Sequence, residues 1–218
     1  MFTLVIGGSA SGKSEYAEQH ILSLSTPEKI SPQSGNRFYT EFGTEFVIGK
    51  LDKTSPQTGN RIYIATMQPF GEDALARIAR HHAMRKDRGF VTIERYTDLA
   101  GLKLPEGSSV LLEDMGNLVA NEMFFKKNAA DEMLPDKIHS DETHAPSGIV
   151  KTVLTGVDHL LPQCAHLTIV TNEVFSDGKT YEKETLRYLR ELAAVNRALA
   201  ARADHVVEVV CGIPNRLK

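Results

Sequence analysis

The sequence predicts an α/β fold of the P-loop NTPase-like class, with a mostly parallel central sheet and helices on both faces. Three observations predict it. A glycine-rich segment at residues 7–14 follows an apolar run at residues 2–6, short apolar runs rich in β-branched residues recur along the chain, and helical patterns lie between those runs. A length of 218 residues is enough for one well-buried domain, 1–218, and does not require two.

Five apolar runs are predicted to be buried strands, at residues 3–6, 61–65, 109–113, 167–171 and 205–210. Continuous apolar runs of this length are typical of parallel strands that helices cover on both faces. Helices are predicted at residues 13–24, 72–88, 114–125, 148–162 and 181–201. Sheets of this kind bind ligands at the carboxyl ends of their strands, where the glycine-rich segment also falls.

Residues 7–14 match the phosphate-binding pattern G-x-x-x-x-G-K-[ST] between a predicted strand and a predicted helix. The glycines allow successive backbone N–H groups to surround a phosphate, and the following helix directs its positive end at that anion. A chance glycine- and serine-rich turn is the alternative, but the strand and helix on either side favour nucleoside triphosphate binding. The candidate nucleotide-binding residues of the loop are Gly7, Gly8, Ser9, Ala10, Ser11, Gly12, Lys13 and Ser14.

Composition excludes several classes of function. The net charge of −3 gives no electrostatic footprint for nucleic acid or for an anionic membrane, and the apolar runs are too short to span a bilayer. Because the first residues lead directly into the phosphate-binding loop, we expect no cleaved signal peptide. The two cysteines, Cys164 and Cys211, lack metal-site spacing and suit a reducing compartment, so we expect a cytoplasmic protein.

Two segments interrupt the alternating pattern. Residues 31–40 are nearly repeated at residues 55–64, which we interpret as a tandem duplication that inserted an extra strand or hairpin after the first helix, at 31–54. Residues 126–147 are polar and contain two prolines, so we expect a second insertion that forms a long surface loop. The histidines of this loop lack a third ligand at metal-site spacing.

The predicted helix at 72–88 contains two adjacent histidines that face different ways. His82 shares a helix face with Leu75 and Ile78, which favours a packed core histidine. His81 lies about 100° away around the helix.

His81 shares its stripe of the helix with Arg77 and Arg85. The two guanidinium groups disfavour the imidazolium form, so they would keep His81 neutral and nucleophilic while holding phosphates against it. A solvated basic helix face is the alternative interpretation.

Four segments, taken in order, resemble the bifunctional adenosylcobinamide kinase/adenosylcobinamide-phosphate guanylyltransferase family of cobalamin biosynthesis. The arginine-isoleucine-x-x-histidine element and the threonine-asparagine-glutamate-valine element are its most specific parts. The similarity spans most of the chain except 31–54 and 126–147. The first segment is the loop at 7–14, followed by Ala17 and Glu18. The second comprises residues 63–66 and 77–85. The third is 111–113, followed by Asn117 and Asn121, and the fourth is 170–174, followed by Asn196 and residues 212–214.

The resemblance implies roles for individual residues. His81 matches the histidine that becomes guanylylated, with Arg77 and Arg85 beside it, and Lys13 matches the loop lysine that contacts nucleotide phosphates. Glu113 takes the place of a Walker-B-like acid that would hold Mg²⁺ together with Ser14. Asp114 is the rival candidate for the metal, and a carboxylate that only caps the next helix is the structural alternative for Glu113.

The resemblance also implies two reactions and an assembly. ATP or GTP phosphorylates the aminopropanol hydroxyl of adenosylcobinamide, and GTP then transfers GMP to that phosphate through the histidine, giving adenosylcobinamide-GDP and pyrophosphate. Homotrimers are implied, with active sites near subunit contacts. The chain departs from the family at residues 175–185, where corrinoid binding or a subunit contact would be affected, and at residue 194.

Three functions remain open from the residues. The chain is the bifunctional enzyme, a P-loop kinase that acts on another alcohol while His81 is a surface residue, or a nucleotide-dependent switch without small-molecule turnover. Formation of a covalent GMP adduct distinguishes the first of these from the other two.

Overall fold

A computed structural model describes residues 1–25, 36–39, 45–48, 60–72, 75–76, 78–79, 88–125 and 147–218. Most of these residues form strands and helices that alternate along the chain. The strands are β1 Phe2–Gly7, β2 Asn36–Tyr39, β3 Glu45–Ile48, β4 Arg61–Ala65, β5 Phe90–Glu94, β6 Ser108–Glu113, β7 Cys164–Asn172, β8 His205–Val210 and β9 Ile213–Arg216. The helices are α1 Lys13–Leu24, α3 Met115–Phe124, α4 Gly148–Leu160 and α5 Lys183–Arg202, with 3₁₀ turns η1 Leu99–Gly101 and η3 Leu161–Gln163.

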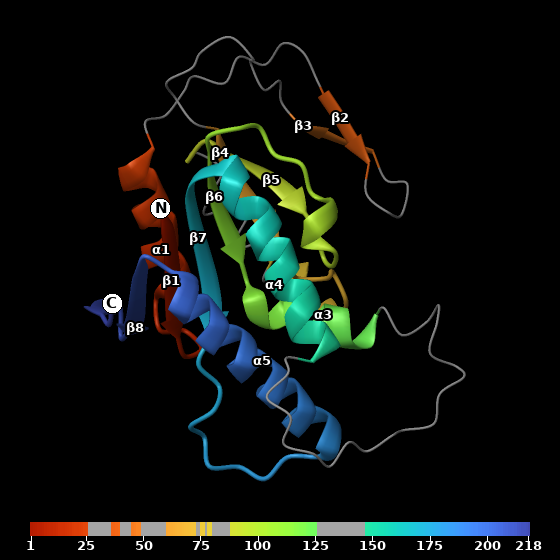
Figure 1. The fold of residues 1–218 in the computed structure, drawn as a ribbon, viewed down its shortest axis with the longest axis vertical. Coiled ribbons are helices and arrows are strands. Elements are labelled where there is room, and N and C mark those ends of the chain that lie inside the picture. Colours follow the sequence, from red (N-terminus) through yellow and green to blue (C-terminus); the bar gives the residue numbers. More distant parts are fainter. Residues whose placement is uncertain are drawn as a thin grey trace.

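Seven of the strands form one sheet in the order β5-β4-β6-β7-β1-β8-β9 (Figure 1). All neighbouring pairs are parallel except β8 with β9, which are antiparallel. Strand β1 lies between β7 and β8, and β7, the central strand of the sheet, separates it from β6. The carboxyl ends of β1 and β6 therefore meet the same edge of the sheet, two strand positions apart.

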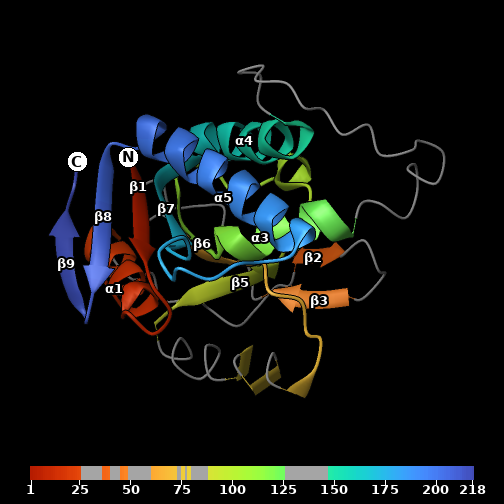
Figure 2. The ribbon, with the colours of Figure 1, turned by 90° about the horizontal axis from the view of Figure 1, so that it is seen from below.

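Helices cover both faces of this sheet (Figure 2). Helices α3, α4 and α5 pack on one face, where the larger cluster of buried side chains includes Leu118, Val157 and Leu192. Helix α1 packs on the other face, where Ala17 and Ile21 lie in a smaller buried cluster. Because both faces are covered, the central strands are apolar on both sides, as a parallel sheet requires.

The predicted fold class and all five predicted strands are confirmed. Strands β5 and β9, which lie at the two edges of the sheet, were not predicted. Strands β2 and β3 form a separate antiparallel pair between α1 and β4, where the sequence predicted an extra strand or hairpin. Among the described helices, none is both long and apolar enough to cross a membrane.

The predicted helix at 72–88 is described only in part. Glu72, Leu75, Ala76, Ile78 and Ala79 are helical. Leu75 is 52% exposed, so the face that the sequence assigned to the core is not buried at this position. The predicted loop at 126–147 lies outside the described residues except for its last residue.

Candidate active site

The loop between β1 and α1 has the backbone geometry of an anion-binding nest. Ala10 and Gly12 both have positive φ angles, of 56° and 90°, whereas the other residues of the loop have negative φ angles. Such alternation turns successive N–H groups toward one concave side. Helix α1 begins at Lys13, and the N–H groups of a first helical turn have no partner within the helix. The loop therefore presents backbone donors and a helix N-terminus to the same point.

Close backbone contacts on the outer side hold the loop in this shape. A Cβ atom added to Gly7 would lie 2.8 Å from the carbonyl oxygen of Val209, and one added to Gly12 would lie 3.1 Å from Cα of Gly212. The Gly212 N–H donates to the Ser11 carbonyl at 2.8 Å. Gly7 and Gly12 are thus required by the packing of the loop against β8 and the turn that follows it.

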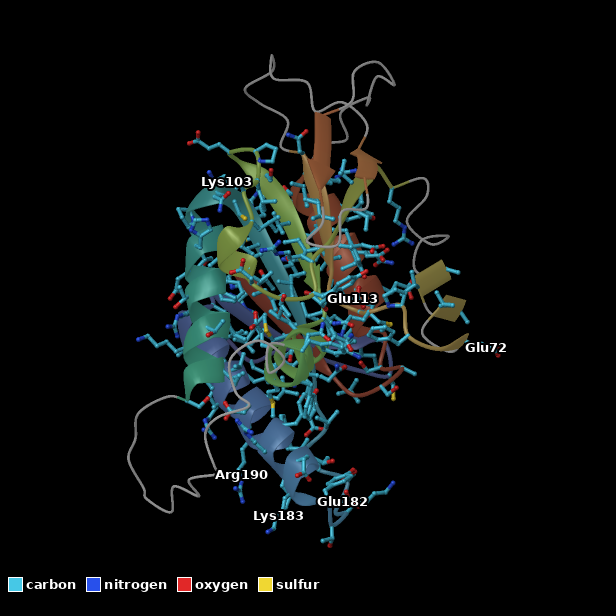
Figure 3. All side chains as sticks on the ribbon, turned by 90° about the vertical axis from the view of Figure 1, so that its right-hand side faces the viewer. Glu72, Lys103, Glu113, Glu182, Lys183 and Arg190 are labelled. Atoms are coloured by element: carbon cyan, nitrogen blue, oxygen red, sulfur yellow. The ribbon has the colours of Figure 1, made fainter. Side chains whose placement is uncertain are left out.

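Glu113 meets the loop at the carboxyl end of β6. Its Oε1 atom accepts a hydrogen bond from the Ser14 hydroxyl, and its Oε2 atom accepts one from the Tyr63 hydroxyl at 3.0 Å. Figure 3 shows Glu113 in the interior of the molecule, whereas the labelled Glu72 and Glu182 lie at its periphery. Ser14 and Glu113, the two candidate metal ligands, are therefore in direct contact in the structure.

The course of α1 explains how two residues from strands that are not neighbours come together. The buried side of α1 packs Ala17 and Ile21 against Leu111 of β6 and Val170 of β7. The first turn of α1 consequently crosses the end of β7 on the face that α1 covers, and Ser14 reaches the end of β6.

Asp114 performs the capping role that the sequence left open for Glu113. Its Oδ1 atom accepts a hydrogen bond from the Asn117 N–H at 2.6 Å at the start of α3. Burial raises the pKa of Asp114, against the opposing effects of the hydrogen bonds from Asn117 and Asn172. The side chain that contacts Ser14 is that of Glu113, whereas Asp114 caps α3.

Lys13 lies over the loop. Its Nζ atom donates to the Gly8 carbonyl at 3.0 Å. Burial lowers the pKa of Lys13, and the carboxylates of Asp114 and Glu113 act in the opposite direction. A partly buried cation next to backbone donors favours a polyanion at this position.

Thr66 fastens the ends of β4 and β6 to each other. Its hydroxyl accepts from the Asp114 N–H at 2.8 Å and donates to the Asp114 carbonyl at 2.7 Å. The Asn121 side chain donates to the carbonyls of Thr66 and Tyr96, at 2.8 and 3.0 Å. These bonds fix the peptide that carries Glu113. Sequence reasoning identified Thr66 and Asn121 only as parts of the resemblance.

Among the candidate residues, three lie outside the described part of the chain: His81, Arg77 and Arg85. Their roles stay predictions. Within the described ranges, no group of three or more histidine, cysteine, aspartate and glutamate side chains forms a metal site by itself.

Comparisons with known proteins point to one family. A family model described as cobinamide kinase / cobinamide phosphate guanyltransferase matches residues 51–217. The bifunctional adenosylcobalamin biosynthesis protein CobU of Escherichia coli (strain K12) is 28% identical over 223 residues, which cover the whole of both chains.

Two solved structures were matched at low similarity. The flagellar accessory protein FlaH from Methanocaldococcus jannaschii has a TM-score of 0.41 at 10% identity, covering 100% of this chain and 77% of that chain. A solved ATPase domain has a TM-score of 0.36 at 10% identity, covering 95% of this chain and 68% of that chain.

Proposed function

Because the chain belongs to the cobinamide kinase / cobinamide phosphate guanyltransferase family, we propose that it catalyses both transfers on a corrinoid substrate. In the first, the γ-phosphoryl group of ATP or GTP passes to a hydroxyl of adenosylcobinamide. In the second, GMP passes from GTP to the new phosphate, giving adenosylcobinamide-GDP and releasing pyrophosphate. The observation that supports this proposal best is the contact between Ser14 of the loop and Glu113 of β6.

The loop provides what phosphoryl transfer requires. This reaction depends mainly on positioning and on neutralisation of charge at the transferred group. The nest and the N-terminus of α1 hold the phosphates, and Lys13 places a cation beside them. Its lowered pKa reflects burial, so bound phosphates would stabilise its charged form.

The donor atoms at the end of β6 fit Mg²⁺. This ion prefers oxygen ligands and is usually held by one or two carboxylates together with substrate phosphates and water. The Ser14 hydroxyl and the Glu113 carboxylate already lie in contact, and Tyr63 orients the carboxylate. We propose that Ser14 and Glu113 hold the ion, which neutralises charge on the terminal phosphates when it is bound.

For the second reaction we propose a covalent intermediate on His81. The imidazole attacks the α-phosphorus of GTP, a phosphorus–nitrogen bond forms, and pyrophosphate leaves with the electrons of the broken phosphorus–oxygen bond. A phosphate oxygen of the corrinoid then attacks the same phosphorus and releases the histidine. Arg77 and Arg85 would stabilise the charge on the α-phosphate.

The test is incubation with α-labelled GTP and Mg²⁺, followed by denaturation. We expect label on the protein that acid removes and base does not, which is typical of a phosphoramidate. His81→Ala should abolish the label but retain phosphorylation of adenosylcobinamide. His82→Ala is the matched control, because it removes the adjacent histidine and should leave both reactions unchanged.

Other outcomes contradict the proposal in distinguishable ways. Phosphorylation of an acceptor without any protein-bound label would indicate a kinase with one activity. Slow nucleotide hydrolysis with no acceptor would indicate a nucleotide-dependent switch. Label that survives in His81→Ala but disappears in His82→Ala would move the nucleophile by one position.

We also propose that the chain assembles as a cytoplasmic homotrimer, as the resemblance implies. Light scattering on the purified protein should give three times the mass of one chain. A monomer that is fully active in both reactions would contradict this assembly.

A further inference from the structure

The turn between β8 and β9 lies directly against the phosphate-binding loop. It comprises Cys211 and Gly212, whose φ angles of 51° and 78° are both positive, as in the two-residue turns of tight hairpins. The Gly212 N–H donates to the Ser11 carbonyl at 2.8 Å, and Cα of Gly212 lies 3.1 Å from the position of a Cβ on Gly12. Turn and loop form one continuous surface.

Two apolar side chains flank this turn and are exposed. Val210, the last residue of β8, is 52% exposed, and Ile213, the first residue of β9, is 70% exposed. The two residues are paired across the hairpin, so their side chains lie on the same face of the sheet. Adjacent exposed apolar side chains next to a ligand loop indicate a surface that a ligand covers.

The order of the strands sets the direction in which a nucleotide extends from the loop. The terminal-phosphate end is marked by Glu113, on β6, which lies on one side of β1. The β8–β9 turn lies on the opposite side of β1. A triphosphate held by the loop with its terminal phosphate toward Glu113 therefore directs its nucleoside toward Val210 and Ile213.

We propose that Val210 and Ile213 form the subsite for the purine base of the nucleotide. This inference rests on the proposed function, because it requires that the loop holds a triphosphate. The faces of a purine are flat and apolar, so burial against two aliphatic side chains is favourable. The edges of adenine and guanine differ but their faces do not. The subsite consequently contributes similar affinity for ATP and for GTP.

The test compares nucleotides with inorganic tripolyphosphate, which has the phosphates but no base. Affinities of the wild-type protein and of Ile213→Ala for ATP, GTP and tripolyphosphate are measured by calorimetry with Mg²⁺. We expect Ile213→Ala to weaken ATP and GTP by about tenfold, the affinity equivalent of the lost apolar burial, and to leave tripolyphosphate unchanged. Val210→Ala should act in the same direction.

Leu217→Ala is the matched control. Leu217 is also an exposed aliphatic residue, at 58%, but it follows β9 at the end remote from the turn. Its replacement should change none of the three affinities. Because all three substitutions remove exposed side chains, none is expected to unfold the protein.

Three results would overturn the subsite. Equal weakening of ATP and tripolyphosphate by Ile213→Ala would show that the side chain only supports the loop. Unchanged affinities, with or without a changed oligomeric state in light scattering, would show that the nucleotide does not cover the hairpin. If the wild-type protein binds neither ATP nor tripolyphosphate, the proposed function itself fails. Tripolyphosphate binding with no gain from the base would refute the subsite alone.

Discussion

Tyr63 is a residue whose importance appears only in three dimensions. Its ring is buried, 4% exposed, and packs edge-on against Phe90 at 6.5 Å. Its hydroxyl reaches Glu113 Oε2 while Ser14 holds the other carboxylate oxygen. A carboxylate fixed at both oxygens loses little freedom when a metal ion binds, so Tyr63 pre-organises the proposed Mg²⁺ site.

Tyr63→Phe should raise the Mg²⁺ concentration that half-saturates nucleotide binding by roughly threefold to tenfold, the usual effect of one lost hydrogen bond to a charged group. The readout is the Mg²⁺ dependence of binding of a fluorescent ATP analogue, which a loss of stability alone would not move. Glu113→Gln should have a larger effect in the same direction.

Tyr96→Phe is the control for this measurement. The Tyr96 hydroxyl donates to Glu94 at 2.5 Å near the end of the adjacent strand β5, so its removal breaks a similar pair away from the loop. A similar shift in Tyr96→Phe, or none in Tyr63→Phe, would contradict the positioning role.

Among the individual site residues, the sequence predicted those that belong to a contiguous motif. Lys13 and Ser14 follow from the loop pattern, whereas the role of Glu113 was implied by the family resemblance, which matches it to an acid at a strand end. The sequence named Glu113 as the candidate acid and Asp114 as its rival. It gave no geometric ground for that choice, because the ground is which of the two adjacent side chains faces α1 and which caps α3. Tyr63 entered only as the first residue of the resemblance segment 63–66. Its contact with Glu113 could not be predicted, since the sequence shows it as one residue of a buried strand.

Among the elements, the P-loop and the β8–β9 hairpin depend on each other. Gly12 combines a φ of 90° with a close approach to Gly212, so a side chain there meets both backbone strain and a contact. Gly107 has a similar φ of 77°, yet a Cβ on it would have no atom within 4 Å. A comparison of substitutions at the two glycines therefore distinguishes the effect of backbone strain from the effect of the contact with the hairpin.

Gly12→Ala and Gly107→Ala should each lower the free energy of unfolding by about 1–2 kcal/mol, because both force alanine into the left-handed region. Gly12→Ala should in addition weaken ATP binding at least tenfold, because the loop must move away from the hairpin. Urea denaturation and calorimetry measure the two effects. Equal ATP affinities in the two variants would show that the hairpin contact has no role in the loop.

The elements that the sequence failed to predict have identifiable reasons. Strand β5 begins after Gly89 with partly buried residues throughout, a pattern weaker than that of the central strands. Strand β9 contains Pro214 and is exposed throughout, which argues against a strand in the absence of a partner. The central strands were predictable because they are apolar on both faces.

For the whole molecule, the strand order places the proposed nucleotide subsites on opposite sides of β1. The alternation of strands and helices along the sequence predicted a parallel sheet whose strands have their carboxyl ends at one edge. It could not predict the order of the strands, because crossover connections of similar length permit several arrangements. In the observed order, α1 packs against β6 and β7, so that Ala17 and Ile21 share a buried cluster with Leu111 and Val170, residues distant in the sequence.

Histidines at the opposite end of the sheet from the active site make folding sensitive to acid. His20 on α1 bonds to Thr3 at 3.1 Å, and burial, then His205 and His166, lower its pKa. Burial, then the N-terminal ammonium group, lower the pKa of His166. Both folded pKa values lie below the ordinary value of 6.5, so the unfolded chain binds protons more readily.

The melting temperature should therefore fall as the pH decreases from 7.5 to 5.5. The contribution of these two groups is complete above pH 6.5 and is lost as the pH falls toward the folded pKa values. His20→Gln/His166→Gln should show a shallower decline in calorimetric scans. His159→Gln, at an exposed position of α4, is the control, and an equally shallow decline there would refute the assignment.

The hairpin turn also gives the unmodified protein a chemical handle. The chain has two cysteines, and burial raises the pKa of the Cys164 thiol to about 12, which makes it a poor nucleophile. Cys211 is exposed at the apex of the turn, next to the residue that contacts the loop. A thiol-reactive fluorophore should thus attach selectively beside the nucleotide site. Occupancy of that site could then be followed in real time without introducing any substitution.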